Sequence, residues 1–118
     1  MKQTLIYDKN DLIVIQATGQ IEYEDKEELN NIFHKVYELG KKNVIFDMGA
    51  INYIGSSGIG VIAKFYKRFR AREGNVYLYN IQDNVKKIFD NIGLSEHISF
   101  INGSFEAVIK EVENENKS

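Results

Sequence analysis

The chain has 118 residues, of which 43% are hydrophobic and 27% are charged, and its net charge is −2. This length fits a single domain spanning residues 1–118. The charge balance argues against direct nucleic-acid binding, because such domains concentrate basic residues on one face. The absence of cysteine excludes disulfides and thiolate chemistry, and no apolar run is long enough to span a membrane, so we expect a cytoplasmic protein.

The first part of the chain predicts a β-hairpin followed by a helix. Apolar runs at 3–7 and 12–21 flank an Asp- and Asn-rich turn at 8–11, which indicates two antiparallel strands. The spacing then becomes helical, acidic residues crowd the first turn, and Gly40 suits the position after the last turn. The predicted buried stripe of this helix is Leu29, Ile32, Phe33, Val36 and Leu39.

The second part alternates strands and helices. We expect strands at 43–48, 76–80 and 97–101, and a loop at 49–58. Helices are expected from 59 to about 72 and from an Asp83 cap to Gly93. A last helix capped by Ser104 should end in a frayed tail at about 113–118. The predicted core residues of the two middle helices are Ile59, Ile62, Ala63, Tyr66, Phe69 or Arg70, and Val85, Ile88, Phe89 and Ile92.

The resulting order, ββαβαβαβα, is typical of an α/β fold. We expect a mixed sheet of about five strands, with an antiparallel hairpin first and mostly parallel strands after it, flanked by four helices. Functional groups of parallel sheets gather beyond the carboxyl ends of the strands. If strands 12–21 and 43–48 are neighbours, the acidic segment 22–25 and the loop that follows residue 48 therefore share one edge.

The sequence GSSG at 55–58 stands in that loop, directly before an amphipathic run. One serine could simply cap the helix, which would contribute about 1 kcal/mol. That explanation leaves Gly55 and Gly58 unexplained, since glycine permits unusual backbone angles or close approach by another molecule. The residues alone leave the capping and the functional interpretations open.

Three catalytic or ligand-binding interpretations fit the residues poorly. The loop lacks the G-K-[ST] ending of a phosphate-binding loop, and it is not the G-x-S-x-G of a hydrolase, for which His34 and His97 stand in unsuitable places. Asp47 could resemble a phospho-acceptor aspartate, but no acidic pair follows the first strand to hold Mg²⁺. We expect Asp47 to be a strand-end residue that accepts hydrogen bonds from loop N–H groups.

A serine modified by a kinase fits the loop better. A phosphoserine carries about −1.5 to −2 charges, which a helix N-terminus can accommodate without unfolding. Next to Glu22, Glu24 and Asp25 this charge would repel an acidic or tightly packed partner. Such a site is a protein–protein switch that needs no catalytic residue, metal or cofactor of its own.

The residues also resemble a known family. "VIFDM", "NYIGSSGIGVIAKFYKRF", Gly74, "VYLYN" and "VKKIFDNIGL" follow the pattern of the STAS domain found in bacterial anti-sigma factor antagonists, and the upstream "ATGQIEYEDKEEL" resembles its strand-to-helix segment. The resemblance covers nearly the whole chain. It implies a non-enzymatic regulator in which the second serine of the Ser-Ser pair, here Ser57, is phosphorylated by an anti-sigma factor serine kinase. A PP2C-type phosphatase removes the phosphate. The resemblance also implies that the protein binds the kinase only when it is unphosphorylated.

On this basis we predict phosphorylation of Ser57, with Ser56 as the second choice. The predicted partner-binding residues are Glu22, Tyr23, Glu24, Asp25, Tyr53, Ile54, Gly55, Ser56, Gly58 and Ile59. The chain departs from the family pattern at Gly55, where an Asp usually precedes the serines, and at Glu22, where an Asp is common. Loss of that acceptor implies slower phosphorylation or a different kinase, or else a scaffold or sensory STAS protein without phosphorylation. A small-anion-binding domain is a more distant alternative.

Overall fold

The computed structural model describes residues 1–94 and 96–115, and its elements follow the predicted order ββαβαβαβα. The strands are β1 (Lys2–Lys9), β2 (Leu12–Ile21), β3 (Asn43–Ile54), β4 (Asn75–Tyr79) and β5 (Ser99–Ile101). The helices are α1 (Lys26–Glu38), α2 (Ser56–Ala71), α3 (Asp83–Asn91) and α4 (Phe105–Glu115), and a short 3-10 turn, η1 (Tyr23–Asp25), precedes α1.

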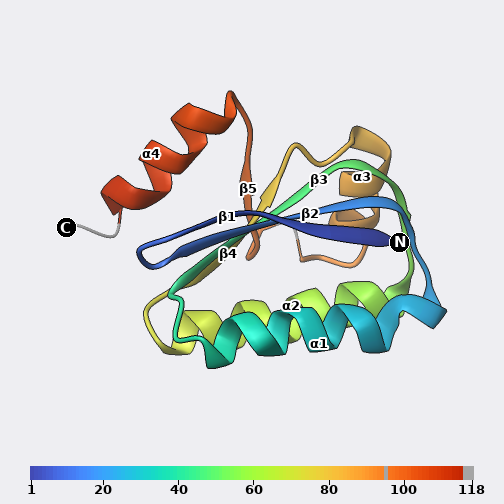
Figure 1. The fold of residues 1–118 in the computed structure, drawn as a ribbon. Coiled ribbons are helices and arrows are strands. Elements are labelled where there is room, and N and C mark those ends of the chain that lie inside the picture. Colours follow the sequence, from blue (N-terminus) through green and yellow to red (C-terminus); the bar gives the residue numbers. More distant parts are fainter. Residues whose placement is uncertain (95, 116–118) are drawn as a thin grey trace.

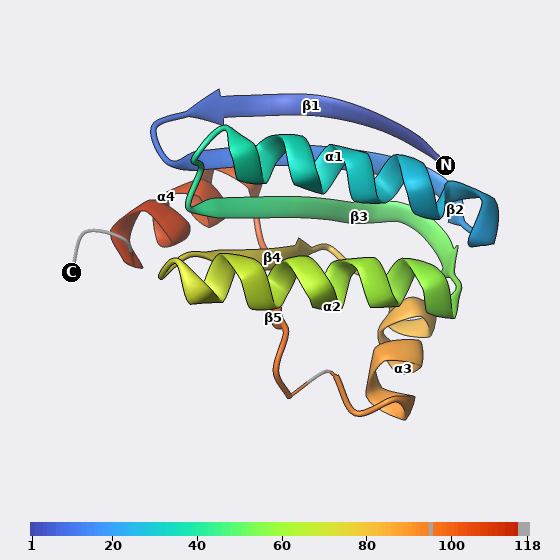
Figure 2. The ribbon, with the colours of Figure 1, turned by 90° about the horizontal axis from the view of Figure 1, so that it is seen from below.

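The five strands form one mixed sheet in the order β1-β2-β3-β4-β5. β1 pairs antiparallel with β2, and the other three pairings are parallel. α1 and α2 lie side by side along one face of the sheet, while α4 lies on the opposite face (Figure 1, Figure 2). The predicted α/β fold, with its initial hairpin and later parallel strands, is confirmed.

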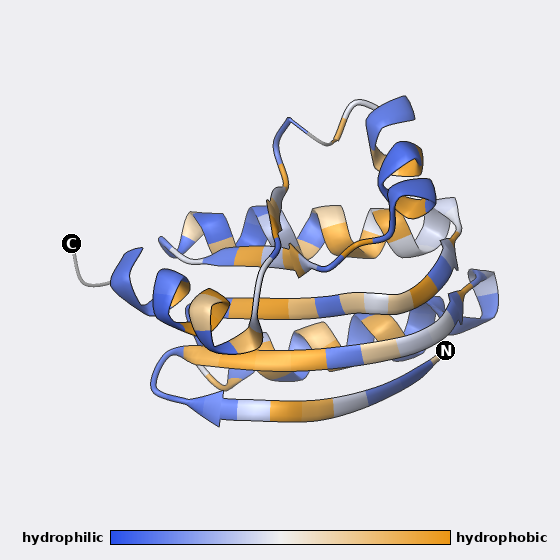
Figure 3. Ribbon diagram, turned by 90° about the horizontal axis from the view of Figure 1, so that it is seen from above, coloured by the Kyte–Doolittle hydropathy of each residue, from blue (hydrophilic) through white to orange (hydrophobic). Residues whose placement is uncertain are grey.

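The larger hydrophobic core lies between the sheet and the α1–α2 pair. Phe33 of α1 packs against Phe46 of β3 and against Phe65 of α2, with ring centroids 5.4 Å apart in both pairs. Hydrophobic residues fill the first half of β2 without alternation (Figure 3), as expected for a strand covered on both faces. This core fixes α1 and α2 on the sheet and so positions the residues at their N-termini.

Tyrosine hydroxyls hold α4 against the other face of the sheet. Tyr7 Oη donates to Glu113 Oε1 at 3.0 Å, and Tyr77 Oη donates to Glu115 Oε2 at 2.7 Å. Burial, assisted by the Glu115 carboxylate, raises the pKa of Tyr77 to about 12. These contacts lie within residues 113–115, so the tail predicted to fray from about 113 is helical there. Residues 116–118 fall outside the described part of the chain.

β3 is longer than predicted, and this is the largest error in the predicted elements. The loop expected at 49–58 is strand as far as Ile54, and α2 begins at Ser56 instead of at Ile59. The second half of β3 pairs with β2 through two register shifts, after Gln16 and after Gly19. These shifts break the two-residue alternation that marks a strand in the sequence.

The ends of the other elements differ from the prediction by a few residues. Leu39 and Ile92, predicted in the core, are 65% and 53% exposed, because each lies just beyond the last residue of its helix. α3 is preceded by Gln82, so Asp83 is its first residue and not its cap, and β5 begins at Ser99 instead of at 97. The Ser104 cap is confirmed, since its Oγ accepts from the backbone N–H of residue 107 at 3.2 Å.

The buried stripe of α2 is turned relative to the predicted one. Ala63 and Tyr66 are only half-buried and Arg70 is exposed. The buried residues of α2 are Gly58, Ile59, Val61, Ile62, Phe65 and Phe69. Ile59, Ile62 and Phe69 were predicted correctly, and the observed stripe includes Val61 and Phe65 in place of Ala63 and Tyr66.

Candidate functional site

The segment after β2 and the start of α2 lie together at one edge of the sheet. β2 and β3 are parallel neighbours, and their last residues, Ile21 and Ile54, are paired. The backbone N–H of Gly55 donates to the Ile21 carbonyl at 2.9 Å, which joins the two segments directly after the strands end. η1 and the beginning of α2 accordingly occupy the same end of the molecule (Figure 2). The predicted shared edge is confirmed.

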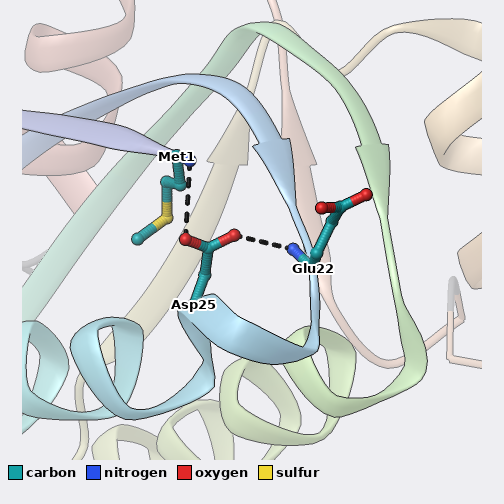
Figure 4. Close-up of polar contacts among 3 residues, drawn as sticks. All are labelled: Met1, Glu22 and Asp25. Carbon is teal, nitrogen blue, oxygen red and sulfur yellow. Dashed lines mark hydrogen bonds and ion pairs between the residues drawn. The ribbon is translucent and has the colours of Figure 1, made fainter.

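Asp25 is a structural carboxylate of the acidic segment 22–25. Asp25 Oδ2 accepts from the backbone N–H of Glu22 at 2.9 Å, and Asp25 Oδ1 lies 3.5 Å from the amino group of Met1 (Figure 4). Glu22, Tyr23 and Glu24 are exposed, Tyr23 to 74%. Asp25 thus shapes the turn, while the three residues before it form the accessible surface.

Both serines lie inside the first turn of α2, and neither caps it. Gly55 occupies the N-cap position, with φ −86° and ψ 170°, and α2 has no side-chain cap. Ser56 is exposed and Ser57 is half-buried. The capping interpretation of the Ser-Ser pair is therefore wrong, and both hydroxyls are located where the N–H groups of the helix end carry partial positive charge.

Ser57 borders two shallow hollows of different charge. The first contains the exposed residues of the acidic segment and is lined by Glu22, Tyr23, Glu24, Tyr53, Gly55, Ser56 and Ser57. The second lies on the side of α1 and is lined by Lys26, Ser57, Gly60, Val61 and Lys64. The first hollow brings together most of the residues predicted to bind a partner. The two lysines and Gly60 of the second were not predicted.

Three of the predicted partner-binding residues are parts of the core. Ile54 and Ile59 are 1% and 3% exposed, and Gly58 is buried between them and β2. A Cβ added at Gly58 would lie 2.7 Å from Ile21 Cγ2 and 3.1 Å from Ile54 Cγ1. The close approach that requires this glycine is therefore made by the sheet of the same chain, and these three residues do not form the surface.

The two glycines of α2 provide a matched pair of substitutions. We expect Gly58→Ala to lower the free energy of unfolding by about 1–3 kcal/mol, because it overpacks the contact with Ile21 and Ile54. Gly60→Ala should raise it by about 0.5–1 kcal/mol, because nothing lies within 4 Å of the added methyl and alanine favours the helix. Chemical denaturation measures both changes, and two shifts of the same sign would contradict the packing.

Gly55 is not required by the backbone. Its φ and ψ suit any residue, and an added Cβ would make only ordinary contacts of 3.7–3.8 Å with Tyr53 and the Ile21 carbonyl. We expect Gly55→Asp to stabilise the chain by about 0.5–1 kcal/mol by capping α2. Denaturation of Gly55→Ala provides the control, which should gain less because it lacks a side-chain acceptor. Equal gains would show that the carboxylate does not cap.

The two histidines are exposed, and Asp47 is held by hydrogen bonds. His34 is exposed and lies 2.9 Å from Glu38 Oε1 one turn along α1, and His97 is also exposed. Asp47 accepts from the Gly49 N–H at 3.0 Å and from Gln16 Nε2 at 3.3 Å. The hydrogen bond to the backbone N–H was predicted, but Asp47 is buried within β3 instead of ending it.

Within residues 1–94 and 96–115, no cluster of three or more His, Cys, Asp or Glu could hold a metal ion. No helix in the same described ranges has the length and apolar character needed to cross a membrane.

Comparison with solved structures shows the fold. The anti-sigma factor antagonist SpoIIAA in its unphosphorylated form superimposes with a TM-score of 0.78 at 18% identity, covering 95% of this chain and 98% of that one. The phosphorylated form of the Bacillus cell fate determinant SpoIIAA gives a TM-score of 0.76 at 20% identity, covering 94% and 99%. The similarity includes nearly all of both chains.

Comparison of sequences identifies the family. An anti-sigma-B factor antagonist of Listeria monocytogenes is 29% identical over 69 residues, which are 58% of this chain and 60% of the relative. That of Staphylococcus epidermidis is 20% identical over 94 residues, covering 80% and 85%. The family model of the STAS domain matches residues 3–112. The chain therefore belongs to the STAS domain family.

Proposed function

We propose that this protein is an anti-sigma factor antagonist that acts by partner switching. Unphosphorylated, it binds an anti-sigma factor serine kinase, and phosphorylation of Ser57 by that kinase releases it. A PP2C-type phosphatase restores the binding form. The role is regulatory, the kinase supplies ATP and Mg²⁺, and the process takes place in the cytoplasm. Relatives named anti-sigma-B factor antagonists, and the two forms of SpoIIAA, support this proposal.

The position of Ser57 is the observation that carries the proposal. Its side chain is partly exposed in the first turn of α2, at a helix end that tolerates negative charge, so a phosphate there would leave the core intact. The same residue borders the hollow that contains the exposed Glu22 and Glu24. A charge added at this point would change the surface offered to a partner without disturbing the fold.

The test is ATP-dependent release of the kinase. The wild-type protein and its kinase should elute together in size-exclusion chromatography with ADP, and should separate after incubation with ATP and Mg²⁺. Ser57→Ala should bind the kinase but remain bound when ATP is added. A wild-type complex that persists in ATP as fully as the Ser57→Ala complex would reject partner switching.

Gly55 favours a second candidate, a scaffold or sensory STAS protein that binds partners without being phosphorylated. The N-cap position offers no side-chain acceptor beside the serines. In that case the complex survives ATP and the protein gains no phosphate. If Gly55 only slows phosphorylation, Gly55→Asp should increase the rate, which separates the two candidates in the same assay.

A further inference from the structure

We propose that Lys26 and Lys64 form a cationic cradle that binds the phosphate of phosphorylated Ser57, a proposal that rests on phosphorylation at that residue. Both lysines line the second hollow with Ser57, and no carboxylate lines it. The hollow on the other side of Ser57 contains Glu22 and Glu24. A phosphate of about −1.5 to −2 charges is attracted to the lysines of the second hollow and repelled by the carboxylates of the first hollow.

The geometry of α2 lets Lys64 reach Ser57. Ser57, Gly60, Val61 and Lys64 follow the i, i+3, i+4, i+7 spacing, so they lie on one stripe of the helix. Seven residues separate the two Cα atoms by about 10.5 Å along the axis. Helical side chains lean toward the N-terminus, which directs Lys64 toward Ser57. Gly60 lies between them, and nothing within 4 Å of its Cβ position obstructs the space.

The contact between α1 and α2 brings Lys26 of α1 to the hollow that Lys64 and Ser57 also line. Lys64 Nζ donates to Asn30 Oδ1 of α1, which holds the ammonium at the seam between the two helices. Lys26 is the first residue of α1 and lies one helical turn before Asn30. Two lysines from different helices therefore line the same hollow as Ser57. The cradle would hold the phosphate over Gly60, between α1 and α2.

The titration of the phosphate tests the cradle directly. Phosphoserine is incorporated at position 57 during translation, and its second ionisation is followed by ³¹P NMR at 0.15 M salt. The proteins compared are the otherwise wild-type chain, the Lys26→Gln/Lys64→Gln double variant, and Lys67→Gln as a control. Lys67 is an exposed lysine of the same helix, and at this salt concentration its more distant charge is largely screened.

The wild-type phosphate should titrate at least about 0.5 pH unit below that of the double variant, because nearby cations favour the dianion. The Lys67→Gln control should titrate with the wild type. Equal midpoints in the wild type and the double variant overturn the cradle. A midpoint in Lys67→Gln that rises as much as in the double variant also overturns the cradle, because it would show that only the net charge of the protein shifts the titration.

The outcome is independent of the kinase, since the phosphoserine is encoded. A lowered midpoint supports the cradle even if the kinase does not modify Ser57, in which case only the proposed switch fails. Kinase-dependent phosphorylation without a lowered midpoint leaves the switch intact and rejects the cradle.

Discussion

Ser57→Asp should weaken binding of the serine kinase more than about tenfold, equivalent to about 1.4 kcal/mol. The substitution places a permanent negative charge in the first turn of α2, on the edge of the hollow that contains Glu22 and Glu24. The interface with the kinase, which accepts the neutral hydroxyl, would then have to bury a charge or hold it next to like charges. The free energy of unfolding should change by less than about 1 kcal/mol, because the helix N-terminus favours the carboxylate.

Isothermal titration calorimetry with the kinase measures this loss, and Ser57→Asn is the matched control. Asparagine has nearly the shape of aspartate without its charge, so it should bind within about threefold of the wild type if charge is the cause. Ser57→Asp binding as tightly as the wild type would contradict the switch. An equal loss in both variants would assign the effect to size instead of charge.

Gly74→Ala should destabilise the protein by about 3 kcal/mol or more. A Cβ at Gly74 would lie 1.7 Å from the carbonyl oxygen of Lys42 and 2.7 Å from its carbonyl carbon. That carbonyl is held in place because it accepts from the Asn75 N–H at 3.0 Å, where β4 begins beside β3. Two backbone segments would have to separate, and no side-chain rotation can relieve the overlap.

Urea denaturation measures this effect, with Glu73→Ala as the neighbouring control. Glu73 is exposed and has φ +67°, a conformation that alanine adopts with similar strain, so its stability should change by less than about 0.5 kcal/mol. A Gly74→Ala midpoint equal to that of Glu73→Ala would contradict the close approach of the Lys42 carbonyl to Gly74.

The elements that follow a regular period were predictable from the sequence. The start of β2 at Leu12 was predicted correctly, because its apolar beginning and the polar turn before it leave little choice of register, although the strand was expected to end near Gly19 and continues to Ile21. The stripe of α1 was correct at Leu29, Phe33 and Val36, which are buried. The fold followed, since alternating strands and helices allow few arrangements.

The second half of β3 was not predictable, because pairing with β2 allows Ile51 and Ile54 both to be buried although they are three residues apart. Because the end of β3 was predicted as a loop that runs to Gly58, the start of α2 was predicted at Ile59 instead of at Ser56. A loop up to Gly58 made Ser57 an isolated loop residue, whereas a helix from Ser56 gives it neighbours at positions 60, 61 and 64.

The accessible part of the candidate site was predictable where it depends on strand order alone. Exposed residues 22–24 and the serines meet because β2 and β3 are parallel neighbours. Lys26 and Lys64 line the same hollow because α1 and α2 pack side by side. The spacing of hydrophobic residues within one helix does not reveal how two helices pack against each other. The burial of Ile59 was predicted from the helical stripe and is confirmed, so its second assignment, to the partner-binding surface, is the part that was wrong.

The mass of the protein after phosphorylation tests the central claim most directly. The wild type, Ser57→Ala and Ser56→Ala are each incubated with the kinase, ATP and Mg²⁺, and their intact masses are measured. We predict that the wild type and Ser56→Ala gain one phosphate and that Ser57→Ala gains none. A Ser57→Ala protein that accepts phosphate as fully as the wild type would contradict the assignment of Ser57 as the switch.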